Sequence, residues 1–174
     1  MSSLQPYVHL IRDVPDFPKP GILFKDITPL LQSGPALHAA IDELAKITND
    51  LNADVVVGVE SRGFLFAAAL AYATNRGVSL VRKPGKLPAH KVRLEYSLEY
   101  GHDTIEMHSD AVLPGQRVLV IDDVLATGGT AGATASLIQS VGGVVVGAAF
   151  LIELSFLAGR ARLGDIPVRS VLTY

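Results

Sequence analysis

The sequence of 174 residues contains no cysteine, which excludes a small secreted scaffold held together by disulfide bonds. Long apolar runs are missing as well. The two most apolar stretches, residues 63–73 and 144–152, are much shorter than the roughly 18 residues that a membrane-spanning helix needs. The amino terminus shows no basic segment followed by an apolar one, so no secretion signal is recognised. We therefore expect a cytoplasmic protein without a membrane partner.

An excess of positive charge is also absent. The formal net charge is −2 and the isoelectric point is near 6.2. Because proteins that bind bulk nucleic acid usually carry a basic face, we expect no nucleic-acid partner. Apolar residues make up 49% of the chain, which is enough at this length to bury the core of one domain.

Two common nucleotide-binding motifs are lacking. No Gly-Lys-Ser/Thr follows the glycine-rich segment, which excludes a Walker loop, and no G-x-G-x-x-G follows a predicted strand. The five histidines show no paired spacing of the kind that binds a metal. The sequence therefore predicts no permanent metal site.

Hydrophobic patterning predicts alternating strands and helices. The expected strands span residues 54–59, 78–82, 117–121 and 144–152, with a short last strand at 168–172, and the expected helices span residues 34–51, 64–75 and 130–141. Residues 91–100 and 104–108 are expected to form an antiparallel excursion. This order is typical of an α/β fold with a doubly wound, mostly parallel sheet. We expect a single domain over residues 1–174, with the core at about 35–154 and a closing segment at about 155–174.

Residues 118–130 (VLVIDDVLATGGT) are the most informative segment. A buried strand leads into Asp122 and Asp123, so both carboxylates are expected in the crevice at the carboxyl end of the sheet. Small residues then open a helix, where backbone N–H groups can bind a phosphate without any lysine. The predicted phosphate ligands are Ala126, Thr127, Gly128, Gly129 and Thr130. The alternative for the same residues is a turn with a helix cap and no ligand.

This segment resembles the phosphoribosyl pyrophosphate signature of type I phosphoribosyltransferases. Residues 17–27 (FPKPGILFKDI), 60–64 (ESRGF), 82–88 (RKPGKLP) and 96–101 (YSLEYG) are similar to the adenine phosphoribosyltransferase family. The matching motifs follow one another in the family's order from about residue 16 to residue 154, which covers most of the chain. The resemblance implies transfer of the 5-phosphoribosyl group from phosphoribosyl pyrophosphate to adenine, giving AMP and pyrophosphate.

The resemblance also implies the architecture of the site. Residues 1–34 would form a small hood, in which Phe24 stacks on adenine while backbone groups of Leu23 and Lys25 bind the edge of the base. Without the resemblance, residues 22–24 would be interpreted as a core strand. A flexible active-site loop would carry Glu99, the candidate for proton handling at the base, although surface exposure is the commoner fate of such a glutamate.

The resemblance implies that pyrophosphate is bound by three basic side chains and by the turn before Arg62. The implied ligands are Glu60, Ser61, Arg62, Lys83 and Lys86, with a cis peptide between Glu60 and Ser61. The alternative for the basic stretch is an ordinary solvated loop. Because two carboxylates beside a pyrophosphate would repel it, we expect a Mg²⁺ ion bridged by the substrate near Asp122 and Asp123. The two carboxylates would also stabilise the positive charge on the ribose.

A homodimer is the assembly that the resemblance implies. Two other functions are considered: a phosphoribosyltransferase for another base, and a regulator that senses phosphoribosyl pyrophosphate without chemistry. The segment around Phe24 and the motif at 96–101 argue against the first of them. The absence of a recognisable DNA-binding segment argues against the second.

Overall fold

The computed structural model describes residues 2–97 and 102–174, and the chain folds into two compact units, residues 1–43 and 44–174. The organisation as a single domain stays a prediction. No helix in the described part of the chain is both long and apolar enough to cross a membrane.

The first unit contains an antiparallel hairpin and short helices. After a 3-10 helix at Gln5–Leu10, strands β1 (Arg12–Pro15) and β2 (Leu23–Asp26) pair with each other. Helix α1 (Thr28–Gln32) follows, and α2 (Gly34–Asp50) begins in this unit and continues into the second. Leu4, Ile27 and Leu30 are fully buried in this unit. The predicted helix from residue 34 is confirmed, and the segment before it proves to contain a strand pair.

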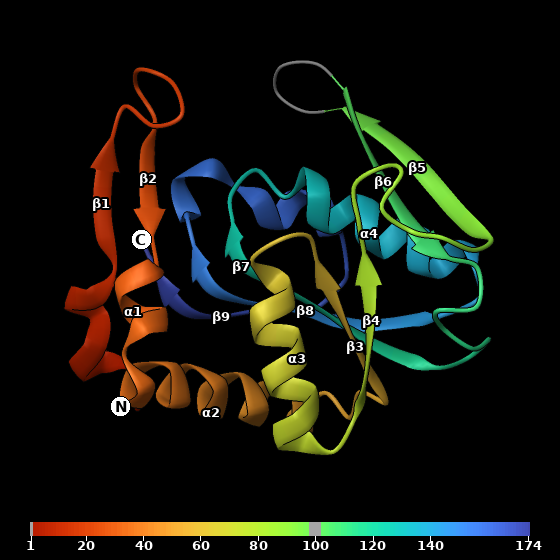
Figure 1. Cartoon of the computed structure of the whole chain (residues 1–174), viewed down its shortest axis with the longest axis horizontal. Helices are drawn as coiled ribbons and strands as arrows, with labels where there is room; N and C mark the ends of the chain where they lie inside the picture. The colour runs from red at the N-terminus through yellow and green to blue at the C-terminus, as the bar shows by residue number, and fades with distance from the viewer. Residues whose placement is uncertain (1, 98–101) are drawn as a thin grey trace. The chain divides into compact units, whose positions relative to one another are not determined.

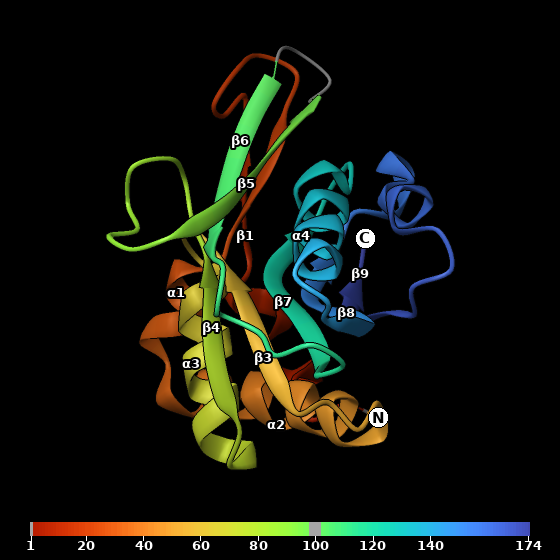
Figure 2. The ribbon, with the colours of Figure 1, turned by 90° about the vertical axis from the view of Figure 1, so that its right-hand side faces the viewer.

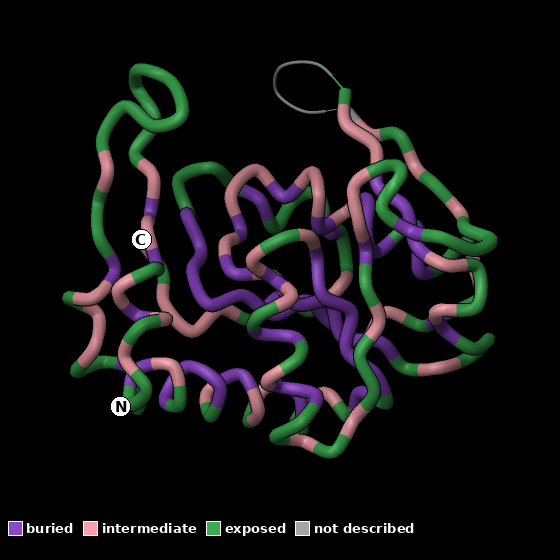
Figure 3. Tube along the Cα trace, viewed as in Figure 1, coloured by how far each residue is buried: buried purple, intermediate pink, exposed green. Residues whose placement is uncertain are grey.

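The second unit is built on a five-stranded parallel sheet with the strand order β4-β3-β7-β8-β9 (Figure 1). Its strands are β3 (Val55–Val59), β4 (Gly77–Val81), β7 (Arg117–Leu125), β8 (Val144–Glu153) and β9 (Val168–Thr173). The central strands are the most continuously buried segments of this unit (Figure 3). Their continuous runs of Val, Ile and Ala suit a sheet that is covered on both faces.

Helices α3 (Gly63–Thr74) and α4 (Gly129–Ser140) cover opposite faces of this sheet (Figure 2). Val57 packs in the core cluster that includes Leu137 and Ile138 of α4. The neighbouring Gly58 faces α3 so closely that an added Cβ would lie 2.7 Å from the Cβ of Ala67. The arrangement confirms the predicted doubly wound α/β fold.

Strand β7 is longer than predicted, and this corrects the position of the acidic pair. The sequence predicts that the strand ends at Ile121, but it continues to Leu125, with Asp122 opposite Phe150 and Leu125 opposite Glu153. The reason is that β8 extends to Glu153 and therefore offers backbone partners well beyond the acidic pair. The two aspartates consequently lie within the strand and not beyond its end.

The predicted antiparallel excursion is confirmed in its described part as β5 (Lys91–Ser97) and β6 (His102–His108), which form a separate two-stranded sheet. Residues 98–100 of the first predicted strand lie outside the described residues. Reciprocal backbone hydrogen bonds of 2.8 Å join Arg82 to Glu106 and link this pair to the end of β4. Two 3-10 helices, Ser155–Leu157 and Gly159–Leu163, lie between β8 and β9.

Candidate active site

The acidic pair meets the amino terminus of α3. Nε of Arg62 lies 2.8 Å from Oδ2 of the buried Asp123, and the half-buried Asp122 accepts a 2.9 Å hydrogen bond from the N–H of Asp123. Gly63 packs directly against Asp122, since an added Cβ would lie 2.9 Å from Oδ1 of Asp122. A glycine at this position therefore lets the helix approach the carboxylate. Three residues from two predicted site segments are thus brought together.

The environment of the pair favours protonation. Burial and the neighbouring charge of Asp123 raise the pKa of Asp122 well above its ordinary value. Burial also raises the pKa of Asp123, against the opposing effect of the Arg62 guanidinium. Positive charge placed beside these carboxylates would be stabilised by them, because a poorly solvated pair of acids gains from any cationic partner.

The predicted phosphate cradle is a turn followed by α4. Gly128 has φ +79°, a conformation that favours glycine, and its carbonyl accepts a 2.9 Å hydrogen bond from the N–H of Gly132. Because α4 begins at Gly129, the N–H groups of its first turn lack acceptors within the helix and can bind an anion. The turn packs tightly on the start of the 3-10 helix Gly159–Leu163, since a Cβ at Gly159 would overlap the carbonyl oxygen of Ala126.

The turn at residues 60–62 and the basic loop are joined by an ion pair that sequence reasoning did not find. Nη2 of Arg82 lies 3.1 Å from Oε1 of Glu60, and Oε2 of Glu60 accepts a 2.8 Å hydrogen bond from the N–H of Lys83. Burial works against ionisation of Glu60, but the Lys83 N–H and Arg82 prevail and lower its pKa. The Glu60–Ser61 peptide is cis, as the family resemblance implies, and the side chain of Lys86 is exposed.

A second network runs from the basic loop to the cradle. Nζ of Lys83 is paired with Oδ2 of Asp103 on β6, and this oxygen also accepts a 3.1 Å hydrogen bond from the Tyr96 hydroxyl. The Tyr96 oxygen is in turn 3.0 Å from Oγ1 of Thr130 in the cradle. Asp103 and Tyr96 were not predicted as site residues. Nothing in their sequence spacing points to this contact, which requires the antiparallel register of β5 and β6.

The predicted base-binding residues belong to the hairpin of the first unit. Leu23 and Phe24 lie on β2, where the ring of Phe24 meets that of Phe17 edge-on, with centroids 5.1 Å apart. Lys25 is buried, and its Nζ lies 2.6 Å from Oδ1 of Asp13. The predicted catalytic residue Glu99 lies outside the described residues.

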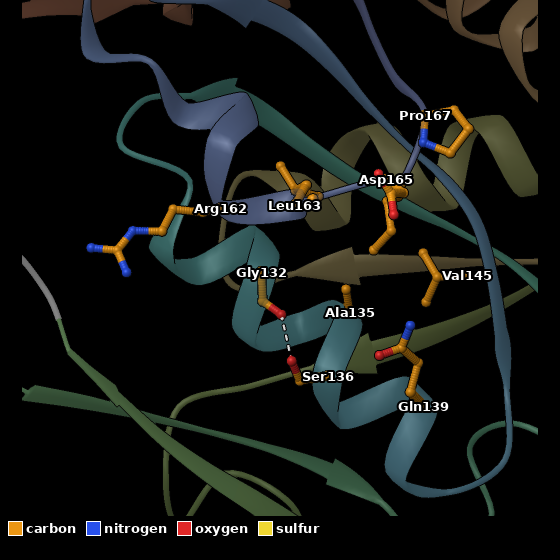
Figure 4. Close-up of a pocket in the computed structure, with 11 residues that line it drawn as sticks. Gly132, Ala135, Ser136, Gln139, Val145, Arg162, Leu163, Asp165 and Pro167 are labelled. Atoms are coloured by element: carbon orange, nitrogen blue, oxygen red, sulfur yellow. Dashed lines mark hydrogen bonds between the residues drawn. The ribbon is translucent and has the colours of Figure 1, made fainter.

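A pocket of about 500 Å³ lies between α4 and the segment that leads to β9 (Figure 4). Ser136, Gln139 and Asp165 are among its lining residues, and Arg162 points away from the others. None of the predicted site residues lines this pocket. It is therefore a feature of α4 separate from the predicted cradle.

Comparison with known proteins places this geometry in a family. Residues 30–167 match the family described as phosphoribosyl transferase domain. The chain is 59% identical to an adenine phosphoribosyltransferase of Solibacter usitatus, over 95% of both chains, and 55% identical to one of Rubrobacter xylanophilus, over 99% of this chain and 94% of the relative. The crystal structure of adenine phosphoribosyltransferase from Thermoanaerobacter pseudethanolicus superposes with a TM-score of 0.96 at 50% identity, covering 98% of this chain and 99% of the other. The chain therefore belongs to the phosphoribosyl transferase domain family and, within it, to the adenine phosphoribosyltransferases.

Proposed function

We propose that the protein transfers the 5-phosphoribosyl group from phosphoribosyl pyrophosphate to adenine, which yields AMP and pyrophosphate and serves purine salvage. The observation that carries this proposal is the acidic pair Asp122–Asp123 on β7, followed directly by a glycine turn and the amino terminus of α4. Identity above 50% to adenine phosphoribosyltransferases over nearly the whole chain supports the choice of base.

The cradle binds the 5′-phosphate through the first-turn N–H groups of α4 and the hydroxyls of Thr127 and Thr130. Asp122 and Asp123 bind the ribose hydroxyls and stabilise the positive charge that develops on the sugar as the bond to pyrophosphate breaks. Their raised pKa values express how poorly their surroundings solvate negative charge, so the positive ribose of the transition state is a favourable partner.

The leaving pyrophosphate requires cations, and we assign Arg62, Lys83 and Lys86 to it, with backbone groups at Ser61 beside them. The Glu60 carboxylate is engaged by Arg82 and by the N–H of Lys83. We therefore assign Glu60 a contribution through its backbone and not through its side chain, because a free carboxylate would repel the ligand.

Mg²⁺ suits this arrangement as a substrate-bridged ion. Carboxylate and phosphate oxygens are its preferred ligands, and Asp122 and Asp123 supply the only acidic pair among the predicted site residues. The described part of the chain contains no cluster of three metal-ligating side chains. When bound, Mg²⁺ neutralises charge between the acidic pair and the pyrophosphate.

Adenine recognition is assigned to the hairpin of the first unit. Leu23 and Lys25 are two residues apart on β2, so their backbone groups point to the same edge of this strand and can meet one edge of a base. Adenine presents an acceptor beside an amino donor, whereas hypoxanthine and guanine present the reverse pattern. Backbone groups of Leu23 and Lys25 that match adenine would be left unpaired by the wrong base, at about 1–3 kcal/mol for each group. Phe24 provides the stacking surface.

Proton handling at the base is assigned to Glu99 on the family resemblance. Its role would be to hold a proton at the purine ring while a loop excludes water from the reactive sugar. The cytoplasmic location expected from the sequence stays a prediction.

A homodimer is proposed as the assembly, and an exposed apolar patch supports it. Val78 and Leu80 on the edge strand β4 are exposed. They pair with Val56 and Gly58 of β3, so their side chains lie on the same face of the sheet as α3. Beside them, α3 exposes Leu65 and Tyr72, the latter to 91%. Light scattering at micromolar concentration tests the assembly, and a monomeric mass for the wild-type chain would contradict it.

The activity is tested by incubating the protein with phosphoribosyl pyrophosphate, Mg²⁺ and each purine or pyrimidine base in turn while nucleotide formation is followed. AMP should appear at the highest rate. Faster formation of another nucleotide would identify a different base, and binding of phosphoribosyl pyrophosphate without any nucleotide would indicate a sensor.

A further inference from the structure

The side chain of Arg82, at the start of the basic loop (residues 82–88), contacts three other residues of the chain. Nε and Nη2 of its guanidinium lie 3.3 Å and 3.1 Å from the two carboxylate oxygens of Glu60, and Nη1 donates to the carbonyl oxygen of Lys86 at 3.1 Å. The guanidinium carbon also lies 5.7 Å from the ring centroid of Phe64, within the range of a cation–π contact.

These contacts join two segments that are far apart in the sequence. Glu60 opens the turn that leads to Arg62, and Lys86 ends the stretch of the basic loop to which pyrophosphate binding is assigned. Backbone hydrogen bonds between Arg82 and Glu106 fix the backbone of the arginine against strand β6. A single planar group therefore sets the spacing between the turn and the loop.

Each of the three guanidinium nitrogens of Arg82 donates one hydrogen bond in this arrangement. The acceptors belong to Glu60 and Lys86, so the side chain acts on its neighbours in the chain. Glu60 in turn holds the N–H of Lys83 at 2.8 Å and thereby fixes the start of the loop. Lysine could supply the charge but not the fork, because one ammonium group cannot reach two carboxylate oxygens and a carbonyl in the same plane.

We propose that Arg82 is a positioning residue for pyrophosphate, which through Glu60 and the Lys86 carbonyl holds the turn at 60–62 and the loop at 83–86 at the separation that the diphosphate group requires. The inference rests on the proposed function and adds to it a residue that acts without touching the substrate.

The test compares R82K with R169K in the full chain. Arg169 is exposed on β9 and is none of the site residues named above, so R169K controls for the loss of a guanidinium. We expect R82K to raise the KM for phosphoribosyl pyrophosphate, and the dissociation constant of magnesium pyrophosphate measured by calorimetry, about tenfold, the effect of one weakened charge-assisted contact. The dissociation constant of AMP, which lacks the pyrophosphate group, should stay within about twofold of the wild-type value.

E60Q provides a second route to the same answer, because it retains shape and weakens the bidentate pair from the other side. The combined variant R82K/E60Q should then show a KM shift smaller than the product of the single shifts. Equal weakening of AMP and pyrophosphate by R82K would show a general structural role and overturn the proposal, as would behaviour like that of R169K. Absence of AMP formation by the wild-type protein would instead overturn the proposed function and the inference with it.

Discussion

Substitution of Gly159 by alanine tests whether the 3-10 helix Gly159–Leu163 determines the shape of the phosphate cradle at residues 126–130. Gly159 is buried, and an added Cβ would overlap the carbonyl oxygen of Ala126 and lie 3.1 Å from the amide nitrogen of Gly128. Both atoms belong to backbone that no side-chain rotation can move away. The cradle turn must therefore shift as a whole to accommodate one methyl group.

The size of the effect follows from this overlap. Restoring ordinary contact requires the two backbone segments to separate by roughly 1 Å, which in a close-packed interior costs about 1–3 kcal/mol of unfolding free energy. A displacement of about 1 Å in groups that position a substrate can lower the rate by about 100-fold. We therefore expect G159A to be folded but less stable, with kcat/KM for phosphoribosyl pyrophosphate reduced between tenfold and about 100-fold.

Urea unfolding measures the stability of G159A, steady-state AMP formation measures its kcat/KM, and calorimetric titration measures its affinity for AMP. G77A is the control, because Gly77 is exposed at the start of β4 and an added Cβ would lie 3.6 Å from Cγ2 of Val55, an ordinary contact that should leave stability and activity nearly unchanged. If G159A matched the wild-type protein in both stability and AMP affinity, the idea that this packing shapes the cradle would be refuted.

Three further outcomes are expected. D122N should lose most activity, yet at pH 8 it should unfold at higher urea than the wild-type protein. The reason is that burial and Asp123 raise the pKa of Asp122 in the folded state. The wild-type protein therefore loses stability as the pH rises from 3.8 through the raised pKa, by up to about 1.4 kcal/mol per pH unit. A gap that did not shrink below pH 4, the region where the aspartate is protonated in both states, would contradict this reason. R160A should lower the unfolding free energy at pH 7 by about 1–3 kcal/mol, because it leaves the buried carboxylate of Glu153 without its partner at 2.6 Å while half of the arginine was already exposed. Since the Arg160 hydrogen bond lowers the pKa of Glu153, the wild-type protein should lose this contribution as pH falls below 4.5, and urea melts of R160A that kept the same acid sensitivity would disprove the assignment. Excess chelator should abolish AMP formation, with recovery on adding Mg²⁺; full activity in the chelator would remove the metal from the proposal.

The alternation of apolar strands and helices predicts the core closely, because each central strand of the sheet is buried on both faces and therefore appears as an uninterrupted apolar run. The end of β7 could not be predicted from that pattern. Asp122 and Asp123 interrupt the apolar run, and only the pairing with β8 shows that the strand continues past them.

Part of the candidate site could likewise be predicted from the sequence, and part of it could not. Residues of the cradle are adjacent in the sequence, so their motif predicts them directly. Arg82, Asp103 and Tyr96 act through partners that are distant in the sequence, and their contacts depend on how β4, β5 and β6 are aligned. Sequence spacing contains no information about such alignment unless the pairing register is known.

The pairing of Lys83 with Asp103 has a consequence for selectivity among small anions. This ammonium group is already balanced by a carboxylate within the chain, and the Tyr96 hydroxyl links the same carboxylate to Thr130. An isolated inorganic phosphate can compete at one end of this network only. Under the proposed function, a sugar with phosphoryl groups at both ends, such as phosphoribosyl pyrophosphate, would replace both contacts together. We therefore expect this site to bind it in preference to simple anions.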